Sequence, residues 1–365
     1  MSGLAVAERL SPEPVADARS ALGYSPAVLD LFAGCGGLSE GFRQAGYSPA
    51  YAVEILEAPA ESYAANFGCP VYTGKIEDFM KDLRGGKVQL PAIDVIIGGP
   101  PCQGFSPLGK MSASKDKQLA HDSLNRLWSY FAQAVKVIQP AVFVTENVPE
   151  FLRSEEFQSY IRSVRRLGYR IEYGTLNADL FGVPQRRKRA FCIGTRDATP
   201  FLPAPNGDRA TVRDAIGHLS KRPTGENWHI GRNPRPSSLE RYKAVPAGGN
   251  RFDLMRNRRD LTPQCWIRKK TGTTDVFGRL EWDKPSGTIR TEFFKPEKGR
   301  YLHPSAHRPI THREAACLQS FPDDFVFCGS KIEVARQIGE AVPPRLAREV
   351  AKAVTAILQA TNHRR

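Results

Sequence analysis

The stretch VLDLFAGCGG, residues 28–37, sets an apolar run directly before a glycine-rich turn. A short apolar run of this kind is typical of a buried strand, and the stretch that follows, Leu38–Ala45, is a candidate helix. Glycines at such a strand-to-helix turn let the backbone bend tightly and approach a ligand at the helix N-terminus. The stretch therefore predicts a β-strand, a ligand-binding turn and a helix in succession.

The same alternation of apolar runs and helical stretches continues to about Thr195. The further candidate strands are Tyr51–Glu54, Ile93–Ile97, Val142–Thr145 and Ala190–Ile193, and further candidate helices include Leu124–Ile138 and Phe157–Leu167. Strands that alternate with helices form βαβ units. We therefore expect an α/β fold with a doubly wound, mostly parallel, Rossmann-like sheet, in which ligands bind at the carboxyl ends of the strands.

The composition is that of a globular protein of about two domains. The chain has 365 residues, of which 41% are hydrophobic and 25% charged, so it can bury a sizeable core. No apolar run approaches the roughly 20 residues of a membrane helix, and residues 1–26 lack the apolar core of a signal peptide. The seven cysteines form no CxxC pair, which argues against a disulfide framework or a zinc site. We expect a soluble, intracellular protein without a metal.

Positive charge is concentrated in one segment, residues 196–310. The whole chain has a net charge of +14, and this segment holds 23 Lys and Arg residues against 12 Asp and Glu residues, a net charge of +11. The segment is rich in Pro, Gly, Arg and Asn and shows little periodicity, so we expect an irregular second domain inserted into the first. The clustered charge is compatible with nucleic-acid binding, although a solvated basic surface explains it equally well.

Regular structure is expected again from Thr311. The residues Thr311–Glu314 form a capping box at a helix start, and Pro343-Pro344 introduce a last helix. The apolar face of this helix holds Leu346, Val350, Val354 and Ile357. This face needs an apolar partner, for which the sheet is the large candidate. The expected domains are an N-terminal extension (1–26), a catalytic and cofactor-binding domain (27–195), the inserted domain (196–310) and a C-terminal segment that completes the catalytic domain (311–365).

Glu54 stands at the end of the second candidate strand. A carboxylate at this position of a Rossmann-like unit accepts hydrogen bonds from ribose hydroxyls. Together with the glycine turn, Glu54 predicts a nucleoside-containing cofactor. A dinucleotide fits these two features as well, and a purely structural turn is a weaker alternative.

Three chemically compatible groups are expected at the carboxyl edge of the sheet. Cys102 follows Pro100-Pro101 after the third strand, Glu146 ends the fourth strand, and the segment Gln185–Arg189 precedes the fifth. A nucleophilic cysteine beside an acid–base carboxylate and guanidinium groups fits covalent catalysis. A single cysteine is more often a buried structural residue, but the convergence of the three groups favours a reactive site.

On these motifs the chain resembles the DNA cytosine-C5 methyltransferases of bacterial restriction-modification systems, from about Val28 to Val354. The pair of motifs Pro-Pro-Cys and Glu-Asn-Val is highly specific for that family. The family's sequence blocks occur in family order at Asp30–Phe42, Gly98–Ser106, Glu146–Val148, Gln185–Arg189, Arg313–Phe325 and Gln337–Pro344. The resemblance implies the fold of the S-adenosylmethionine-dependent methyltransferases, S-adenosyl-L-methionine as cofactor, double-stranded DNA as substrate and a target-recognition domain at residues 196–310.

The resemblance also implies a mechanism. A thiolate from Cys102 adds to C6 of a cytosine, which makes C5 nucleophilic enough to take a methyl group. Glu146 holds and protonates N3, which needs a raised pKa or a shared proton, while Arg189 contacts O2 and Arg187 steadies Glu146 and the nucleophile loop. Because these atoms are inaccessible in a stacked duplex, the target base must be flipped out.

Further residues receive roles from the resemblance alone. The expected cofactor contacts are Phe32, Gly34, Gly36, Gly37, Glu54, Ile76, Pro100, Leu127 and Glu340. The expected DNA contacts are Gln103, Ser106, Thr288 and Arg290, with Thr288-Ile289 as the family's Thr–aliphatic pair. Two positions depart from the family pattern. Lys75 replaces an Asp beside the adenine, and Glu340 replaces an Asn near the transferred methyl group, where its carboxylate either faces the sulfonium or turns to solvent.

Two alternatives stay open: a tRNA cytosine-C5 methyltransferase and a catalytically inactive DNA-binding relative. The loop Cys102–Ser106 and the length of the inserted segment favour DNA, and the presence of Cys102, Glu146 and Arg189 favours activity. We expect a monomer in the bacterial cytoplasm or nucleoid, without a membrane partner, and a cognate restriction endonuclease, if one exists, acts separately.

Overall fold

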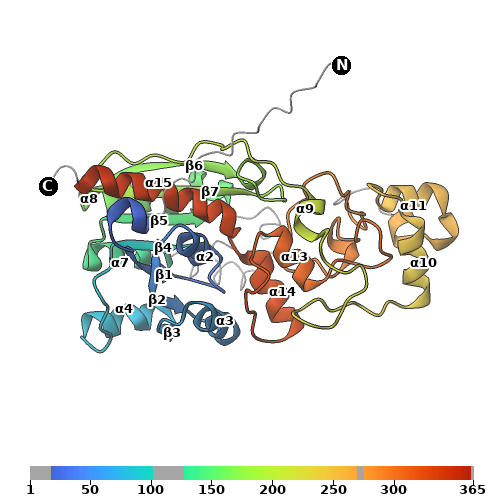
Figure 1. Ribbon diagram of the computed structural model, residues 1–365, viewed down its shortest axis with the longest axis horizontal. Coiled ribbons are helices and arrows are strands. Elements are labelled where there is room, and N and C mark those ends of the chain that lie inside the picture. Colours follow the sequence, from blue (N-terminus) through green and yellow to red (C-terminus); the bar gives the residue numbers. More distant parts are fainter. Residues whose placement is uncertain (1–17, 102–126, 269–274, 363–365) are drawn as a thin grey trace, which may run out of the picture.

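The computed structural model describes residues 18–101, 127–268 and 275–362, and a seven-stranded sheet forms its centre (Figure 1). The strands are β1 (Ala27–Leu31), β2 (Ser48–Glu54), β3 (Val71–Thr73), β4 (Val95–Gly98), β5 (Val142–Asn147), β6 (Arg170–Asn177) and β7 (Lys188–Thr195). Their order in the sheet is β3-β2-β1-β4-β5-β7-β6. The strands β1 to β5 pair in parallel, and β7 runs antiparallel to both β5 and β6. The predicted mostly parallel α/β sheet is therefore confirmed.

The sequence pattern does not predict β3 and β6, the strands at the two edges of the sheet. β3 has three residues, none of them buried, and in β6 Leu176 alone is buried. A strand that is covered on both faces forms a continuous apolar run, whereas these edge strands lack one. The signal used to identify the other strands is therefore missing at both edges.

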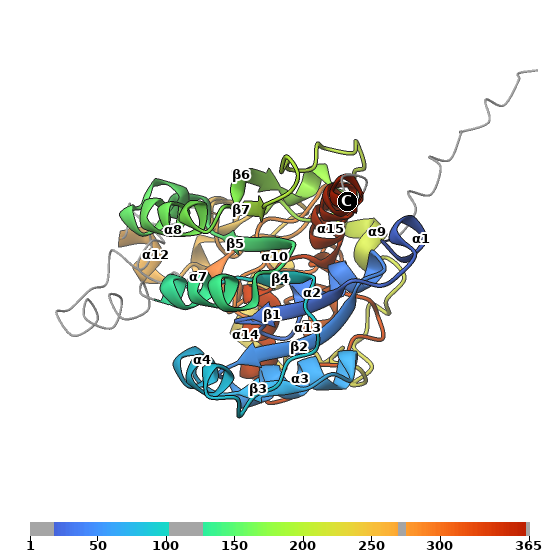
Figure 2. The same ribbon diagram turned by 90° about the vertical axis from the view of Figure 1, so that its left-hand side faces the viewer.

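Helices cover both faces of the sheet, which makes it doubly wound (Figure 2). One face is covered by α2 (Gly37–Gln44) and α15 (Pro344–Asn362), and α1 (Ala18–Leu22) packs against α15. The other face is covered by α4 (Ile76–Arg84), α7 (Leu127–Ile138) and α8 (Glu155–Arg166), while α3 (Glu57–Phe67) contacts β2 and β3. Among the described helices, none is long and apolar enough to span a membrane.

The last helix packs on the sheet as predicted. The four residues of its apolar face are at most 1% exposed: Leu346, Val350, Val354 and Ile357. They share one apolar cluster with Val28 of β1, Val95 of β4 and Val142 of β5. The C-terminal end of the chain thus completes the helical layer that α2 begins near the N-terminal end.

Part of the expected N-terminal extension belongs to this layer. Ala18 in α1 is fully buried, and its backbone N–H donates to the carbonyl of Ala45 at 2.7 Å. Residues from Ala18 onward are therefore packed against the sheet-containing part of the chain.

The described residues of the inserted segment, 196–268 and 275–310, form short helices joined by long loops. The helices are α9 (Val212–Ile216), α10 (Pro236–Ala244), α11 (Arg251–Asn257) and α12 (Gln264–Arg268), and two further helices follow this segment, α13 (His312–Leu318) and α14 (Lys331–Glu340). Val212, Leu280 and Phe293 share an apolar cluster with Ala315 of α13 and Ile338 of α14. The apolar core of the segment thus continues past residue 310.

A buried ion pair fastens this segment to α13. Glu314 closes the predicted capping box, because its N–H donates to the Thr311 hydroxyl at 3.1 Å and its Oε2 accepts from the Thr311 N–H at 2.7 Å. Both oxygens of Glu314 also accept hydrogen bonds from the Arg308 guanidinium, at 2.7 and 2.8 Å. The pair is bidentate, which is the strong geometry for a guanidinium and a carboxylate.

His303 lies next to this ion pair and is 2% exposed. Its Nε2 is 3.6 Å from Glu314, and its Nδ1 accepts hydrogen bonds from the backbone N–H groups of Ser305 and Ala306 at 3.1 and 2.9 Å. Protonation of Nδ1 would break both hydrogen bonds, because a protonated nitrogen no longer accepts from the two N–H groups. Burial lowers the pKa of His303 from 6.5 to about 4.

We expect the contribution of His303 to the free energy of unfolding to decrease as the pH falls from 8 to 5, whereas the buried carboxyl of Asp30, with a pKa of about 8, acts in the opposite direction. Below pH 6.5 the unfolded chain binds a proton on His303 that the folded protein does not take up until about pH 4. The contribution of His303 therefore falls by about 2 kcal/mol between pH 8 and pH 5. Urea denaturation at both pH values should give a change that is more favourable by about this amount in His303→Asn than in the wild type, because the side-chain carbonyl of Asn still accepts from the two N–H groups but does not titrate. An equal change in both proteins would contradict this origin.

Candidate active site

The carboxyl ends of β1, β4 and β5 meet at one edge of the sheet. Leu31 pairs in register with Gly98, and Gly98 with Thr145, so the residues that follow each strand lie side by side. The Nδ2 of Asn147 donates a hydrogen bond to the carbonyl of Pro100 at 3.0 Å. This bond joins the Glu-Asn-Val motif at the end of β5 to the Pro-Pro segment that follows β4.

Glu146 is buried at this edge and forms an ion pair with Arg189 of β7. The Nε of Arg189 is 2.9 Å from Oε1 of Glu146. Gly99 leaves room for the carboxylate, since a Cβ on Gly99 would lie 3.0 Å from Oε2. Burial raises the pKa of Glu146, and the charges of Arg189 and Arg187 oppose the rise. A buried carboxyl with a raised pKa is suited to hold a proton and pass it to a bound molecule.

Arg187 is fully buried, and its hydrogen bonds go to backbone carbonyls. Its guanidinium donates to the carbonyls of Ile289 and Gly339 at 3.0 and 2.9 Å, and to that of Glu340 at 3.3 Å. Arg187 acts on Glu146 through its charge, which lowers the pKa of that carboxyl, and no hydrogen bond between the two side chains occurs among the described residues. Its hydrogen bonds instead join the 185–189 segment to two distant parts of the chain.

Gln185 also binds Ile289 and in addition binds Gln319 after α13, although sequence reasoning assigned it no role. Its Oε1 accepts from the Ile289 N–H at 2.8 Å, and its Nε2 donates to Oε1 of Gln319 at 2.7 Å. The hydroxyl of Thr288 donates to the carbonyl of Arg186 at 2.9 Å. The one signal in the sequence is a glutamine placed directly before a run of arginines.

The inserted segment meets this edge of the sheet near Arg290 and Gly339. The side chain of Arg290 is exposed. A Cβ on Gly339 would lie 2.4 Å from the backbone nitrogen of Thr291, so only glycine allows α14 to approach this turn. Thr288 and Arg290, both expected to bind DNA, are therefore placed beside the segment that carries Arg189.

The turn between β1 and α2 combines strained and open positions. Phe32, Gly34 and Gly36 have φ values of 60°, 55° and 92°. A Cβ on Gly36 would lie 2.3 Å from the ring of Phe67, whereas the space beside Gly34 is open. No side chain among the described residues caps the N-terminus of α2 at Gly37, which leaves backbone N–H groups available to a bound molecule.

Glu54 is buried at the carboxyl end of β2 and anchors this turn. Its Oε2 accepts from the Gly34 N–H at 2.8 Å and its Oε1 from the Leu56 N–H at 2.9 Å. Burial raises the pKa of Glu54, and the charge of Glu340 adds to the rise. Each carboxylate oxygen keeps a lone pair for a ligand hydroxyl.

Glu340 ends α14 with 55% of its side chain exposed, and its Oε1 is 3.0 Å from Nε of Arg336. The residues that follow it pack against the start of α2, since a Cβ on Gly37 would lie 3.1 Å from Cβ of Ala341 and 2.5 Å from the carbonyl oxygen of Val342. The charge of Glu340 also raises the pKa of Glu54. Glu340 is therefore close to the turn between β1 and α2 while being partly neutralised by Arg336.

Ile76 and Leu127, two further expected cofactor residues, are the first residues of α4 and α7. Because α4 directly follows β3 in the chain, Ile76 lies at the carboxyl edge of the sheet. Leu127 begins the helix that precedes β5. Ile76 is buried, and Lys75, which replaces the family's Asp, is exposed directly before it.

Asp30 is a buried acid within β1 to which sequence reasoning assigned no role. Its Oδ2 accepts a hydrogen bond from the Ser39 hydroxyl at 2.7 Å, and Oγ of Ser39 is 2.7 Å from the hydroxyl of Tyr63. Burial raises the pKa of Asp30 to about 8. An acidic residue inside an apolar run is the sequence signal for such a buried, hydrogen-bonded group.

Part of the expected site lies outside the described residues, namely Cys102, Gln103 and Ser106. Burial raises the pKa of Cys35 and Cys192 to about 12 and that of Cys69 to about 11. A thiol with such a pKa is protonated at neutral pH, and the protonated form is a poor nucleophile. These three cysteines are therefore unsuited to covalent chemistry.

Residues 27–356 match the family of C-5 cytosine-specific DNA methylases. The type II methyltransferase M1.HphI of Haemophilus parahaemolyticus is 37% identical over 336 residues, which cover 89% of this chain and 86% of the relative. The type II methylase M.HgiDII of Herpetosiphon aurantiacus is 31% identical over 93% of this chain and 97% of its own.

Solved structures show the same architecture. A prophage-encoded Escherichia coli protein described as a DNA modification methyltransferase superposes with a TM-score of 0.68 at 27% identity, over 92% of this chain and 99% of that one. The Dnmt2 methyltransferase of S. pombe superposes with a TM-score of 0.64 over the same shares. Its identity is 17%, so this second likeness concerns the fold alone.

Proposed function

Because the chain belongs to the family of C-5 cytosine-specific DNA methylases, we propose that it transfers a methyl group from S-adenosylmethionine to C5 of a cytosine within a specific short sequence of duplex DNA. Family membership makes the chain a DNA cytosine methyltransferase, and the proposal adds the cofactor, the covalent step and the sequence specificity. The observation that carries it is the buried Glu146–Arg189 pair, which Asn147 joins to the segment leading into Cys102.

The turn between β1 and α2 fits S-adenosylmethionine. The open space beside Gly34 gives a ligand access to the backbone, and the N-terminus of α2 offers N–H groups to a carboxylate. Glu54 accepts hydrogen bonds from ribose hydroxyls. When bound, S-adenosylmethionine supplies a methyl group on a positively charged sulfur. The other proposed contacts are Phe32, Gly36, Gly37, Ile76, Pro100, Leu127 and Glu340.

In the proposed reaction the Cys102 thiolate forms a bond with C6 of the cytosine, and Glu146 donates a proton to N3 as the ring accepts the electron pair. C5 then takes the methyl group. Loss of the C5 proton to a base, return of the N3 proton to Glu146 and departure of Cys102 as a thiolate restore the aromatic ring. The raised pKa of Glu146 supports its role as proton donor, and Arg189, which orients Glu146, contacts O2 of the base.

The DNA is held between the carboxyl edge of the sheet and residues 196–310, with the target base flipped out of the helix. The net charge of +11 in this segment supports contacts to phosphates. Thr288 and Arg290 contact the DNA from the inserted segment, and Gln103 and Ser106 contact it from the loop after Cys102. We assign residues 196–310 as the target-recognition domain, with α13 and α14 completing its core.

The cellular setting follows from the relatives. M1.HphI and M.HgiDII are type II enzymes by name. We therefore place the chain in a bacterial restriction-modification system, where it acts as a monomer in the cytoplasm or nucleoid and any cognate endonuclease is a separate protein.

Expression in a methylation-free host, followed by bisulfite sequencing of its DNA and tRNA, tests this function. The expected result is methylated cytosine within one short DNA motif and none in tRNA, with no methylation in a host that expresses Cys102→Ala. Methylation confined to tRNA would make the chain an RNA enzyme. DNA binding without any methylation would make it an inactive relative, and either result contradicts the proposal.

We expect Arg290→Ala to weaken DNA binding on all sequences by removing one phosphate contact. The slope of log affinity against log salt should decrease in magnitude by about 0.9, the contribution of one phosphate. Fluorescence anisotropy with a labelled duplex at several salt concentrations measures this slope. Arg19→Ala is the matched control, because α1 directly precedes the amino end of β1 and lies away from the carboxyl edge. An unchanged slope in Arg290→Ala would remove Arg290 from the interface.

Glu340→Gln should weaken the binding of S-adenosylmethionine more than that of S-adenosylhomocysteine. A carboxylate near the sulfonium favours the charged cofactor over the neutral product. The exposed pair with Arg336 limits the difference to about 0.5–1 kcal/mol, roughly two- to fivefold. Calorimetric titration with both cofactors measures it, and Arg336→Gln, which frees the charge of Glu340, should shift the preference in the opposite direction. Equal changes for both cofactors would show that Glu340 does not act on the sulfonium.

A further inference from the structure

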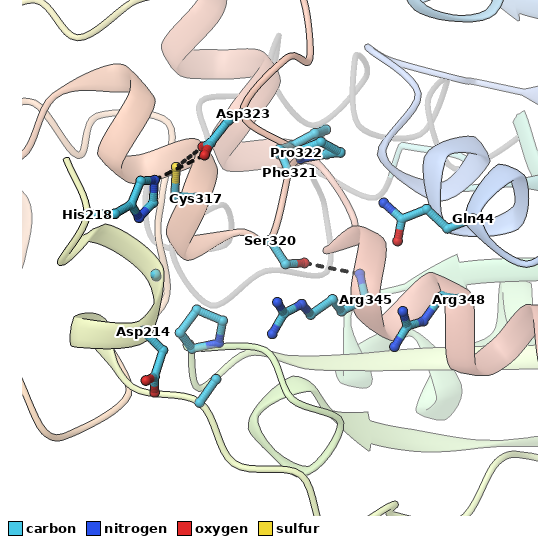
Figure 3. Close-up of a pocket in the computed structure, with 13 residues that line it drawn as sticks. Gln44, Asp214, His218, Cys317, Ser320, Phe321, Pro322, Asp323, Arg345 and Arg348 are labelled. Carbon is cyan, nitrogen blue, oxygen red and sulfur yellow. Dashed lines mark hydrogen bonds and ion pairs between the residues drawn. The ribbon is translucent and has the colours of Figure 1, made fainter. Parts of the chain in front are cut away.

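A pocket of about 360 Å³ lies apart from the residues of the active site (Figure 3). It is lined by Gln44 at the end of α2, Arg345 and Arg348 in the first turns of α15, Asp214 of α9, and residues of the turn after α13. Figure 3 shows the guanidinium of Arg345 reaching into the pocket from α15, with Arg348 beside it. In Figure 2, α9 and α15 lie on the opposite side of the molecule from α12. Because α15 covers the sheet and α9 belongs to the inserted segment, the pocket lies between these two parts of the chain.

The acidic groups of this pocket are already paired with donors of the protein. Oδ1 of Asp323 accepts from the thiol of Cys317 at 3.2 Å, and its Oδ2 is 3.0 Å from Nε2 of His218. Oδ2 of Asp214 accepts from the N–H and the hydroxyl of Thr211 at 2.8 and 2.7 Å. Neither carboxylate therefore needs a donor from a ligand.

Among the described residues, the two arginines keep guanidinium N–H groups without hydrogen-bond acceptors, although the charge of Arg345 acts on Asp214 and lowers the pKa of that carboxyl. Within the described part of the chain, the guanidinium of Arg345 makes one hydrogen bond, to the carbonyl of Gly182 at 2.9 Å. The Nε of Arg348 is buried without a hydrogen-bond partner there. It lies 3.5 Å from Oε1 of Glu349, and the same oxygen is 2.9 Å from Nζ of Lys352. The pocket therefore offers guanidinium N–H donors, while its carboxylates are already engaged.

We propose that this pocket binds a small molecule through an oxyanion, either a phosphate monoester or a carboxylate, which Arg345 and Arg348 hold together. Guanidinium groups pair with such oxyanions through two parallel hydrogen bonds. The volume is within the range of small-molecule sites and leaves room for an organic group beside the oxyanion. Pro184, Ala215 and Phe321 provide an apolar wall for that group.

The ligand contacts both parts of the chain and a side chain next to the cofactor turn. The ring of Phe321 lines the pocket, and its Cζ is 3.3 Å from the position of a Cβ on Gly37 at the start of α2. A molecule that binds the folded protein alone also stabilises it. Occupancy should therefore raise the melting temperature.

Calorimetric titration of the full chain with phenyl phosphate, benzoate and inorganic phosphate, without DNA or cofactor, tests this site. We expect saturable binding of one phenyl phosphate or one benzoate, and the tighter of the two identifies the oxyanion. Inorganic phosphate should bind more weakly because it does not use the apolar wall. The double variant Arg345→Gln/Arg348→Gln should weaken binding at least about tenfold, since hydrogen bonds between charged groups are the strong ones.

Arg162→Gln is the matched control, because Arg162 is exposed on α8 at the other face of the sheet, and it should leave binding unchanged. Arg348→Gln alone provides a second variant, and its melting temperature without ligand reports whether it folds. Binding that is equal in the wild type and the folded arginine variants would overturn the proposal. So would the absence of saturation at about 10 mM ligand, ten times a millimolar Kd, or an equal loss of duplex DNA affinity in the double variant, which would make the pocket part of the DNA interface.

Discussion

Glu146→Gln is expected to lower the rate of methyl transfer about a thousandfold, within the range of roughly 10²–10⁴ that a positioned acid or base contributes. Glutamine keeps the size of the side chain but does not give up a proton to N3. It also removes the charge that pairs with Arg189 at 2.9 Å. Single-turnover rates on a duplex that carries the target motif measure the effect on chemistry directly.

The matched control is Glu150→Gln, an exposed glutamate shortly after Glu146 in the chain, which should keep the rate within about twofold because surface substitutions of this kind have small effects. S-adenosylmethionine affinity in Glu146→Gln should match the wild type, since Glu54 and the glycine turn hold the cofactor. A rate loss below tenfold in Glu146→Gln would contradict its role as proton donor.

The sheet and the last helix were predictable because burial leaves a periodic signal in the sequence. Strands covered on both faces form continuous apolar runs, and Leu346 and Ile357 lie on one helical face that matches the sheet. The residues at the carboxyl edge were predictable for a related reason. The ends of parallel strands meet at one edge, so Glu146 and the segment after β4 had to be neighbours.

The contacts between distant loops were not predictable from periodicity. Arg187 binds the carbonyls of Ile289 and Gly339, and Gln185 binds both Ile289 and Gln319. These bonds depend on how irregular segments are placed against each other, and a single sequence carries no periodic signal for that placement. The pocket at Arg345 is assembled in the same way, from segments far apart in the chain.

Cys102→Ala is expected to abolish methyl transfer, because C5 of an unactivated cytosine is a poor nucleophile and the covalent step divides one difficult reaction into two easier ones. The variant should still bind DNA and S-adenosylmethionine, since Cys102 is not among the groups proposed to hold either. Methyl incorporation and binding, measured on the same preparation, separate loss of chemistry from loss of folding. Turnover at the wild-type rate would exclude a covalent step through Cys102.

The most direct test of the covalent mechanism is incubation with S-adenosylmethionine and a duplex that carries 5-fluorocytosine at the target position. Fluorine does not leave C5 as a proton does, so after methyl transfer the bond between Cys102 and C6 persists. The account predicts a protein–DNA complex that survives denaturing electrophoresis in the wild type and in Cys35→Ala, whose native thiol has a pKa of about 12, and that is absent in Cys102→Ala. A complex that forms in Cys102→Ala, or one whose crosslinked peptide contains Cys35 or Cys317, would contradict it.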